Sequence, residues 1–352
     1  MADRKTEDEH SAFGKRHTGI AIQSLVLLIP CMFIFVGCRR PASTASQARY
    51  LMGTIVEVAA VGEDSLQCAK AVKCAFDAMK EVDLLMSVYR PESQISELNR
   101  TGGDAWVRVD PKLFHVIASA QDYSRLSQGA FDVTAGPLVR LWGFFDKRGR
   151  LPSPEEEAEV RGRVGYRHLH LDPARTAVRF DRQGMEIDLG GIAKGYALDR
   201  AVDALRAEGV KQAVVNAGGN LFVLGGPASL ALSNPINRDG LLCRIEVRDE
   251  AVSTSGASEN FFAEDGVRYG HIFDPRAGRP VSNGLLSVTV VAPTGISSDA
   301  LSTATFVLGR VEGMAMIERL EDVGAIFVSE SADALTGIEI LISSRLRGRV
   351  MR

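Results

Sequence analysis

The stretch MEIDLGGIAKGYALDRAVDALRAEG, residues 185–209, combines a strand-like start, two adjacent glycines and a helix-like pattern. After the glycines, apolar residues recur at helical spacing as far as Leu205. This spacing gives the expected helix one broad apolar face and places Asp199 and Asp203 on its polar face. The stretch therefore predicts a strand, a glycine turn and a long helix that ends near Gly209.

The two glycines, Gly190 and Gly191, stand at the N-terminus of this expected helix. Free backbone N–H groups at such a terminus favour an anion, although the spacing matches neither the P-loop nor the dinucleotide-binding glycine pattern. Lys194 falls in the first turn, where a cation opposes the helix dipole. A ligand phosphate beside Lys194 would account for it. A tight turn with the lysine side chain reaching solvent accounts for it equally well.

The chain on both sides of this stretch alternates between strands and helices. Residues 65–86 carry apolar side chains at helical spacing, with Ser65 as the expected cap. Residues 212–226 have the pattern of a strand, a glycine turn and a second strand. Further strands are expected at 52–62, 168–188, 241–247, 252–254, 268–273 and 285–292, and further helices at 109–129, 151–165 and 297–309. No Pro/Gly-rich linker divides the chain, so the sequence predicts one α+β domain with mainly antiparallel sheet and packed helices.

Composition limits the partners and the source of stability. The chain has 352 residues, 45% of them apolar, and a net charge of −3, so no basic field indicates a nucleic-acid partner. After Cys38 only Cys68, Cys74 and Cys243 remain. Six residues of helix separate Cys68 from Cys74 by about 9 Å along the axis, which is too far for a disulfide. The fold must therefore rest on its apolar core.

The N-terminus has the features of an export signal. A polar segment ends in the basic residues Lys15 and Arg16, and an apolar segment then leads to Val36-Gly37-Cys38. A basic region, an apolar core and small residues before a cysteine resemble a bacterial lipoprotein signal. This predicts a signal peptide over 1–37, lipidation at Cys38 and a linker over 38–48. The alternative is an uncleaved transmembrane anchor, because the apolar segment is long enough to span a bilayer. In both cases the remaining chain is exported and tethered to the membrane.

The segment SSDALSTATF, residues 297–306, places two hard oxygen ligands four residues apart. On a helix Asp299 and Thr303 share a face. A carboxylate and a hydroxyl suit Mg²⁺, which takes few protein ligands together with substrate phosphates. An ordinary helix cap at Asp299 is the alternative.

The segment YGHIFDPRAGRPV, residues 269–281, contains a candidate general base. If residues 268–273 form a strand, Tyr269, His271 and Phe273 point to one face, and an Asp-Pro turn follows. A histidine at a strand end could accept a proton, although a lone histidine is more often structural. His168 and His170 are interpreted as a partly exposed pair on a strand, because no further Cys or His completes a zinc site.

Several segments together resemble the ApbE family of FAD:protein FMN transferases. They occur in the family's order over roughly residues 49–330, and they read MGTIVEV, MSVYRPESQISELN, GAFDVTAGPLVRLWGF, DLGGIAKGYALD, VNAGGNLFVLG, VSTSG, GHIFDPRAGRPV and SSDALSTATFVLG. The resemblance implies a T-fold-like domain over 49–345. It also implies a reaction in which the FAD pyrophosphate is cleaved, FMN is moved onto a Thr or Ser hydroxyl of an acceptor protein, and AMP is released.

The resemblance also implies a role for each matching residue. Residues implied to bind FAD are Met52, Tyr89, Ala130, Phe131, Asp132, Asp188, Lys194 and Ile272. Residues implied to ligate Mg²⁺ are Asp299, Thr303 and Gly191, the last through its carbonyl. His271 would be the base that deprotonates the acceptor hydroxyl.

The chain departs from the family pattern at Ala257, Ser258 and Ala277, which puts fine substrate contacts in question. The same residues would also serve a Mg²⁺-dependent FAD pyrophosphatase that yields FMN and AMP, or a flavin-binding lipoprotein without turnover. The family expectation for acceptors is proteins of membrane electron-transport complexes. The expected location is the periplasmic, extracytoplasmic face of a bacterial inner membrane, with a lipid anchor.

Overall fold

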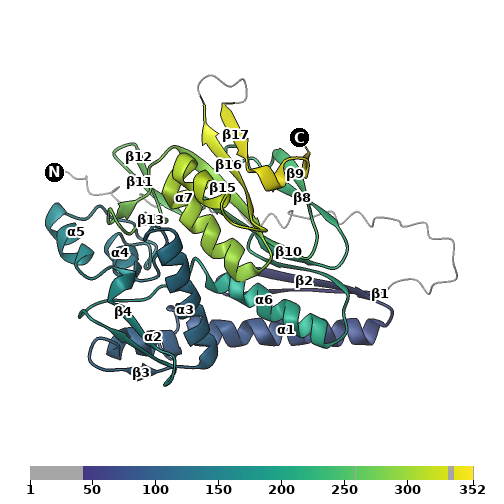
Figure 1. Cartoon of the computed structure of the whole chain (residues 1–352), viewed down its shortest axis with the longest axis horizontal. Coiled ribbons are helices and arrows are strands. Elements are labelled where there is room, and N and C mark those ends of the chain that lie inside the picture. The colour runs from purple at the N-terminus through teal and green to yellow at the C-terminus, as the bar shows by residue number, and fades with distance from the viewer. Residues whose placement is uncertain (1–42, 258, 332–336, 352) are drawn as a thin grey trace, which may run out of the picture.

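The computed structural model describes residues 43–257, 259–331 and 337–351. Its centre is an eight-stranded sheet in the order β1-β2-β6-β7-β10-β15-β16-β17 (Figure 1), in which every neighbouring pair is antiparallel. The strands are β1 Ser43–Leu51, β2 Thr54–Gly62, β6 Gln212–Ala217, β7 Asn220–Leu224, β10 Glu250–Gly256, β15 Leu285–Ala292, β16 Gly324–Glu330 and β17 Ile338–Ile342. The expected α+β domain with mainly antiparallel sheet is confirmed.

The first strand corrects the predicted linker. β1 pairs with β2 along its whole length, from Ser43 opposite Gly62 to Leu51 opposite Thr54. Residues 43–48, expected to belong to a linker over 38–48, are therefore part of the sheet. β1 is an edge strand whose side chains are mostly exposed. Its pairing uses backbone groups, so its polar sequence carries no alternating apolar signal that would have revealed it.

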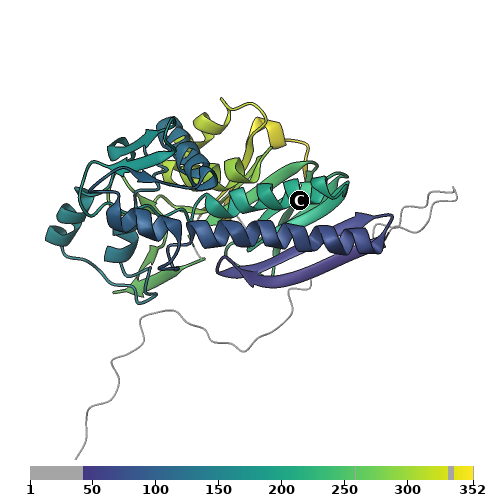
Figure 2. The same ribbon diagram turned by 90° about the horizontal axis from the view of Figure 1, so that it is seen from below.

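Three helices cover one face of the sheet and enclose the main core. They are α1 Ser65–Met86, α6 Ala193–Ala207 and α7 Gly295–Ile317, and Figure 2 shows α1 running alongside α6 and the β1–β2 hairpin. The bounds of α1 match the prediction, but Asp64, not Ser65, caps it by accepting a hydrogen bond from the Leu66 amide. α7 is interrupted at Gly309, whose φ of 79° is non-helical.

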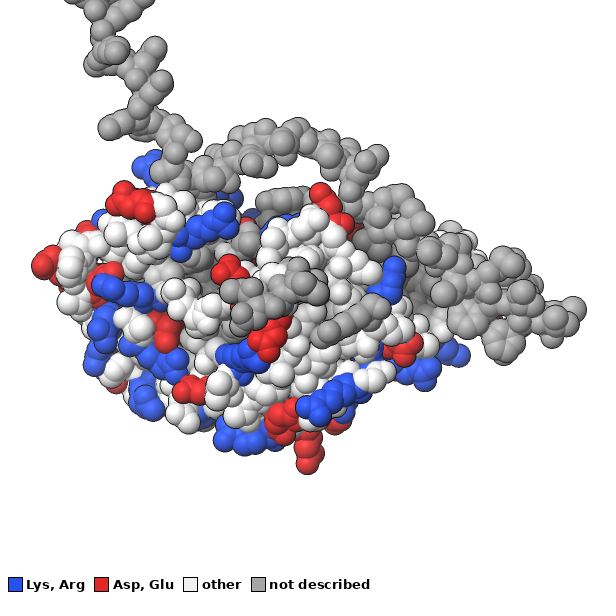
Figure 3. Space-filling model, turned by 90° about the horizontal axis from the view of Figure 1, so that it is seen from above, with Lys and Arg blue, Asp and Glu red and all other residues white. Residues whose placement is uncertain are grey.

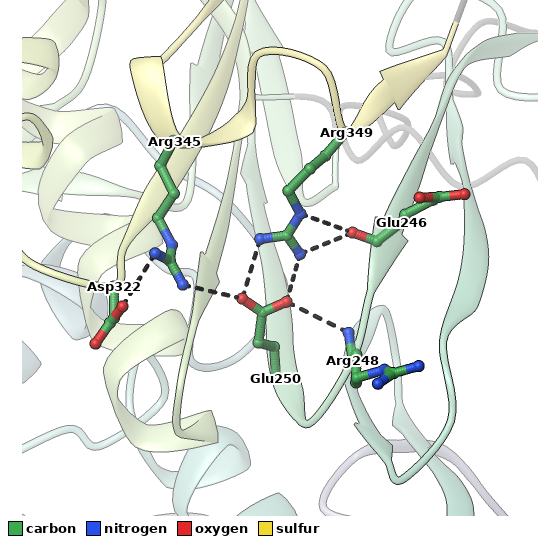
Figure 4. Close-up of polar contacts among 6 residues, drawn as sticks. All are labelled: Glu246, Arg248, Glu250, Asp322, Arg345 and Arg349. Carbon is green, nitrogen blue, oxygen red and sulfur yellow. Dashed lines mark hydrogen bonds and ion pairs between the residues drawn. The ribbon is translucent and has the colours of Figure 1, made fainter.

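A smaller three-stranded sheet packs on the other face of the central sheet around a second apolar core. Its strands are β8 Ala228–Ser233, β9 Leu241–Val247 and β18 Val350–Met351. The nearly buried carboxylate of Glu250, 9% exposed, joins the two layers (Figure 4). Arg349 donates to both of its oxygens and Arg345 donates to one, at 3.4 Å. These ion pairs attach the C-terminal segment to β10.

The remaining elements form the end of the molecule that carries α2 to α5 (Figure 1). The helices are α2 Gln94–Thr101, α3 Pro111–Leu126, α4 Gly136–Leu141, α5 Pro154–Arg161 and the short 3-10 helix η1 Tyr166–His168. A second 3-10 helix, η2 Ser344–Leu346, lies near the C-terminus and contacts β16 instead. The strands are β3 Val107–Arg108, β4 Leu169–Asp172, β5 Ala177–Phe180, β11 Phe261–Glu264, β12 Val267–Gly270, β13 Phe273–Asp274 and β14 Arg279–Pro280. A third apolar core at this end contains Trp142, Phe262 and Phe273.

The tethering prediction concerns residues that the structure does not describe. Cys38 and the apolar segment before it lie outside the described residues, and no helix within residues 43–351, gaps aside, is long and apolar enough to cross a membrane. Cys68, Cys74 and Cys243 form no disulfide, as expected. Basic and acidic side chains are interspersed on the face drawn in Figure 3, in keeping with the small net charge.

Candidate active site

The glycine turn is held in place from two sides before α6 begins. Residues 185–188, expected as a strand, are an extended segment with only an isolated bridge between Ala135 and Glu186. Asn99 fixes this segment by exchanging two hydrogen bonds with the Ile187 backbone, at 2.8 and 2.9 Å. The Asp188 amide donates to the Val133 carbonyl at 2.7 Å. The backbone thus enters the turn in one fixed direction.

Within the turn, Asp188 and Lys194 approach the same backbone segment. Oδ1 of Asp188 accepts a hydrogen bond from the Gly190 amide at 2.8 Å, and Nζ of Lys194 donates to the Gly190 carbonyl at 3.2 Å. Burial raises the pKa of Asp188, while the Gly190 hydrogen bond and the charge of Lys194 oppose the rise. The predicted nucleotide-binding pair is therefore brought together. Lys194 therefore does not simply extend into solvent, and it forms no ion pair with the residues that the structure describes.

The three predicted metal ligands come from two distant segments and converge. Asp299 on α7 is 4% exposed, and its Oδ2 accepts a hydrogen bond from the Gly195 amide of α6 at 2.9 Å. Gly191 faces Thr303 so closely that a Cβ on the glycine would lie 3.2 Å from the threonine Oγ1. Oδ1 of Asp299 accepts no hydrogen bond from the described residues. Thr303, one helical turn after Asp299 on α7, thus lies beside the glycine turn that carries the Gly191 carbonyl.

This donor set suits a hard cation. Mg²⁺ prefers oxygen ligands and is usually held by one or two carboxylates plus substrate phosphates. Among the described residues, no group of three or more His, Cys, Asp or Glu side chains could hold a metal ion. A soft-metal site of the zinc type is therefore absent from the described part of the chain, whereas the set of Asp299, Thr303 and the Gly191 carbonyl fits Mg²⁺.

Hydroxyl groups of β10 support α7 at this point. Oγ of Ser253 lies 2.8 Å from that of Ser298, and Oγ of Ser255 lies 2.9 Å from that of Ser302 and 3.4 Å from Oγ1 of Thr303. Ser253 and Ser255 both belong to β10, which extends beyond the strand expected at 252–254. Sequence reasoning missed their role, because the alternation of small polar residues along β10 becomes informative only when its neighbour is known.

His271 lies between two short strands and is oriented by one carbonyl. The strand expected over 268–273 ends at Gly270, and β13 begins at Phe273. The Asn260 carbonyl accepts from the His271 amide at 3.0 Å and lies 3.1 Å from its Nδ1. A carbonyl can only accept, so Nδ1 carries the proton and Nε2 keeps its lone pair. Burial lowers the pKa of His271 to about 4, and the charge of Lys194 contributes.

The segment that carries His271 is anchored by aromatic rings. The ring of Trp142, at the end of α4, lies 5.5 Å from that of Tyr269, 6.0 Å from that of Phe273 and 6.4 Å from that of Phe262. These contacts fix the strands on both sides of His271 against a rigid core. The expectation that Tyr269, His271 and Phe273 share one strand face is replaced by a turn that directs only the two aromatic rings into this core.

The predicted FAD contacts at residues 130–132 differ in what their side chains do. Phe131 is 3% exposed, and a Cβ on Gly191 would lie 3.2 Å from its ring, so it lines the glycine turn. The Asp132 carboxylate faces inward. It accepts from the Thr134 amide and hydroxyl and from the Tyr166 amide, at 2.7 to 2.8 Å. Its side chain therefore stabilises the turn that places Ala130 and Phe131.

Tyr89, Met52 and Ile272 lie at the edges of this region. Tyr89 is 62% exposed and stacks on Phe145 with a centroid distance of 4.9 Å. Burial of its hydroxyl end raises the pKa of Tyr89, and the negative charge of Asp188 adds to the rise, which places the two side chains near each other. Met52 occupies the β1–β2 turn with a φ of 52°, and both Met52 and Ile272 pack partly buried against the main core.

A further carboxylate at the site was not singled out from the sequence. Burial raises the pKa of Glu259, the charge of Asp299 adds to the rise, and Lys194 opposes it. The charges of Asp299 and Lys194 thus act on Glu259, although Glu259 is an exposed residue. It follows Ser258, where the chain departs from the family pattern, and no motif reasoning pointed to it.

The prediction that His168 and His170 form a pair on one strand is wrong for His168, although both rings share one carboxylate. Nε2 of His170 lies 2.7 Å from Oδ2 of Asp181, and Nδ1 of His168 lies 3.8 Å from the same oxygen. His168 closes η1 instead of lying on a strand. Both rings are partly exposed, and they do not join the residues around Gly191.

Comparison with known proteins places this geometry in a family. A model described as the ApbE family matches residues 52–327, which include every predicted site residue except Cys38. An FAD:protein FMN transferase of Klebsiella pneumoniae (strain 342) is 34% identical over 296 residues, covering 82% of this chain and 90% of that protein. One from Treponema pallidum (strain Nichols) is 32% identical over 326 residues, covering 86% and 90%.

Solved structures agree. The flavin transferase ApbE from Vibrio cholerae superposes with a TM-score of 0.78 at 30% identity, covering 88% of this chain and 100% of that one. The ApbE protein from Thermotoga maritima superposes with a TM-score of 0.79 at 31% identity, covering 87% and 99%. The chain therefore belongs to the ApbE family.

Proposed function

We propose that this chain transfers FMN from FAD to a Thr or Ser hydroxyl of an acceptor protein and releases AMP. The similarity to FAD:protein FMN transferases over most of the chain supports this activity. The single observation that carries the proposal is the convergence of the Asp188–Lys194 pair, the oxygen ligands around Gly191 and a neutral His271. Those groups match the needs of phosphoryl-type transfer, which are mainly positioning and charge stabilisation.

Mg²⁺ would be held by Asp299, Thr303 and the Gly191 carbonyl. The support is the chemistry of these donors and the free Oδ1 of a buried carboxylate. When bound, the cation draws charge from the pyrophosphate oxygens, which makes phosphorus more electrophilic and stabilises departing AMP. Lys194, in the first turn of α6, adds positive potential on the same side.

His271 would accept the proton of the acceptor hydroxyl at Nε2. A neutral hydroxyl is a poor nucleophile, so a nearby base assists its attack. The Asn260 carbonyl holds the proton on Nδ1 and so presents Nε2 as the acceptor. The hydroxyl oxygen then bonds to the FMN phosphorus, and the bond from that phosphorus to the bridging oxygen breaks. The electron pair leaves with AMP.

The isoalloxazine and ribityl parts of FAD would lie along Met52, Tyr89, Ala130, Phe131, Asp132 and Ile272. Phe131 supports this placement because its ring borders Gly191. Tyr89 offers an exposed aromatic surface near Asp188. Asp132 would act through the turn that its carboxylate stabilises.

An assay with the full chain in detergent micelles, FAD, Mg²⁺ and a candidate acceptor tests the proposal. Mass spectrometry of the acceptor should show the added mass of FMN, with AMP in equal amount. Free FMN with unmodified acceptor would instead indicate an FAD pyrophosphatase. Bound FAD without AMP release would indicate a flavin-binding protein without turnover.

We further propose that Cys38 is lipidated and that the enzyme faces the extracytoplasmic side of a bacterial inner membrane. The support is the basic, apolar and small-residue pattern that precedes Cys38. Because β1 begins at Ser43, at most about 18 Å of chain separates a lipidated Cys38 from the sheet. So short a tether favours acceptors at the membrane surface, such as subunits of membrane electron-transport complexes.

Metabolic labelling with a radioactive fatty acid tests the anchor. The wild type should incorporate label, and the Cys38→Ala variant should not. A matched Cys31→Ala variant, changed within the preceding apolar segment, should keep the label. Equal labelling of wild type and Cys38→Ala would refute lipidation at this cysteine.

A further inference from the structure

The N-termini of α6 and α7 cross with their backbones in contact. Gly195 in the first turn of α6 meets Gly295, the first residue of α7. A Cβ on Gly195 would lie 2.5 Å from the Gly295 carbonyl carbon and 2.6 Å from the Asp299 Cβ. A Cβ on Gly295 would lie 3.0 Å from both the Gly195 carbonyl carbon and the Leu198 Cβ. Only glycine at both positions permits this approach.

The same two segments carry one spacing twice. Residues 195–199 read GYALD and residues 295–299 read GISSD. Each has a glycine at the crossing and an aspartate four residues later, about one helical turn on. Each aspartate therefore lies one turn after its own crossing glycine, close to the first turn of the other helix.

The hydrogen bonds across the crossing are reciprocal. The Gly195 amide donates to Oδ2 of Asp299 at 2.9 Å. The Gly295 amide donates to Oδ1 of Asp199 at 2.6 Å, and the Ile296 amide donates to Oδ2 of Asp199 at 2.9 Å. Each helix thus satisfies N–H groups that its partner's first turn leaves without intrahelical acceptors. Ile192, the N-cap residue of α6, has no side-chain oxygen for this purpose.

The two aspartates differ in how many of their carboxylate oxygens accept a hydrogen bond. Asp199 uses both oxygens on α7 amides. Asp299 uses one oxygen on an α6 amide, and its Oδ1 accepts nothing from the described residues. One aspartate of the pair thus uses both oxygens at the crossing, and the other keeps one oxygen without a hydrogen-bond donor among the described residues.

We infer that Asp199 is a positioning residue, which fixes the start of α7, and thereby Asp299 and Thr303, against the glycine turn at the start of α6. This rests on the proposed function for the metal role of Asp299. Because the proposed carbonyl ligand Gly191 lies just before α6 while the other two lie on α7, a change in the crossing changes the distance from Gly191 to both Asp299 and Thr303. Burial raises the pKa of Asp199 to about 6 against two hydrogen bonds, in keeping with a carboxylate enclosed by the crossing.

The test compares Asp199→Asn with Asp203→Asn in the full chain in detergent micelles. The control removes the same charge from the same helix one turn later, where Asp203 is exposed and pairs, among the described residues, with Arg200 at 3.1 Å. Hydrogen exchange of peptides covering 295–303 reads the crossing directly. Electron paramagnetic resonance titration with Mn²⁺ in the presence of FAD reads the cation site without relying on turnover.

In Asp199→Asn, we expect amides of residues 295–303 to exchange at least about tenfold faster, because charge-assisted hydrogen bonds are lost. We expect Mn²⁺ to bind about 10- to 100-fold more weakly, the usual effect of losing a residue that orients metal ligands. Asp203→Asn should match the wild type in both. If Asp199→Asn does not fold, Asp199→Ser, which keeps one hydrogen-bond acceptor, undergoes the same measurements.

Unchanged exchange in the Asp199 variant would overturn the inference. Faster exchange with unchanged Mn²⁺ affinity would also overturn it, because Asp199 would then stabilise the helix without positioning Asp299. If the wild type binds no Mn²⁺, the metal assignment of the proposed function fails, and the exchange data alone decide the role of Asp199. Absence of FMN on the acceptor, with normal Mn²⁺ binding, would refute the transfer reaction only.

Discussion

The glycine contact between α6 and α7 makes Gly195→Ala a demanding test of the structure. The added Cβ would lie 2.5 Å from the Gly295 carbonyl carbon, whereas carbon atoms in contact are about 3.5 Å apart. The helices must therefore separate by about 1 Å at this point. The hydrogen bond from the Gly195 amide to Asp299, now 2.9 Å, would lengthen beyond bonding distance.

The expected change in the free energy of unfolding combines two destabilising contributions and one stabilising contribution. Overpacking of this kind costs about 1–3 kcal/mol, and a lost hydrogen bond to a charged group costs about 1.5–3 kcal/mol. Replacing glycine by alanine within a helix returns about 1 kcal/mol. We expect Gly195→Ala to lower the free energy of unfolding by about 1.5–5 kcal/mol. FMN transfer should fall about 100-fold, because a 1 Å displacement can have that effect on catalysis.

Urea unfolding, followed by the fluorescence of the buried Trp142, measures the stability, and the acceptor mass assay measures the transfer. Gly162→Ala is the matched control, since Gly162 has an ordinary helical φ of −61° at the end of α5 and lies at the surface. It should stay within about 0.5 kcal/mol of the wild type. A Gly195→Ala protein with wild-type stability and full transfer would refute the close crossing.

Four further outcomes are expected. Asp299→Ala should abolish Mg²⁺-dependent AMP release from FAD; unchanged release would refute the metal assignment. His271→Gln should lose transfer while still binding FAD, as measured by flavin fluorescence. The pKa of His271 is about 4 in the folded protein and about 6.5 in the unfolded chain, so the unfolded chain binds the proton more readily between these pH values. The free energy of unfolding should therefore rise between about pH 4 and 6.5, and it should rise less steeply in the variant. Glu250→Gln, which leaves Arg345 and Arg349 without their buried partner, should lower stability by about 3–5 kcal/mol without changing FAD affinity. EDTA should weaken FAD binding, measured by fluorescence titration, in the wild type but not in Asp299→Ala.

The sequence predicts elements well where side-chain periodicity reports burial, and poorly where backbone contacts decide. α1 was predicted at its observed bounds because its apolar residues repeat along one face. β1 was missed because an exposed edge strand pairs through its backbone. The strand expected through Phe273 stops at Gly270 because the aromatic core around Trp142 bends the chain at His271.

The same distinction applies to the site. Motif resemblance pointed to Lys194, Asp299 and His271, and the structure gathers the segments that carry them. Asp199 was expected on a solvent-facing helix side, because periodicity within one helix cannot show that a second helix N-terminus lies against it. The repeated Gly-x-x-x-Asp spacing was visible in the sequence. It gains meaning only when residues about 100 positions apart are known to meet.

Charges of both signs surround the glycine turn. Asp188, Asp299 and Glu259 are its acidic residues, Lys194 with Arg140 or Arg238 opposes the rise in pKa of Asp188 and Glu259, and burial favours the neutral form of His271. The amides of the two helix N-termini, which would otherwise attract an anion, are largely engaged by aspartates. The proposed divalent cation would add positive charge beside the negatively charged pyrophosphate. FAD and this cation should consequently strengthen each other's binding by the same factor, so that the Gly191 carbonyl, as a proposed ligand of the cation, should affect nucleotide binding as well as Lys194.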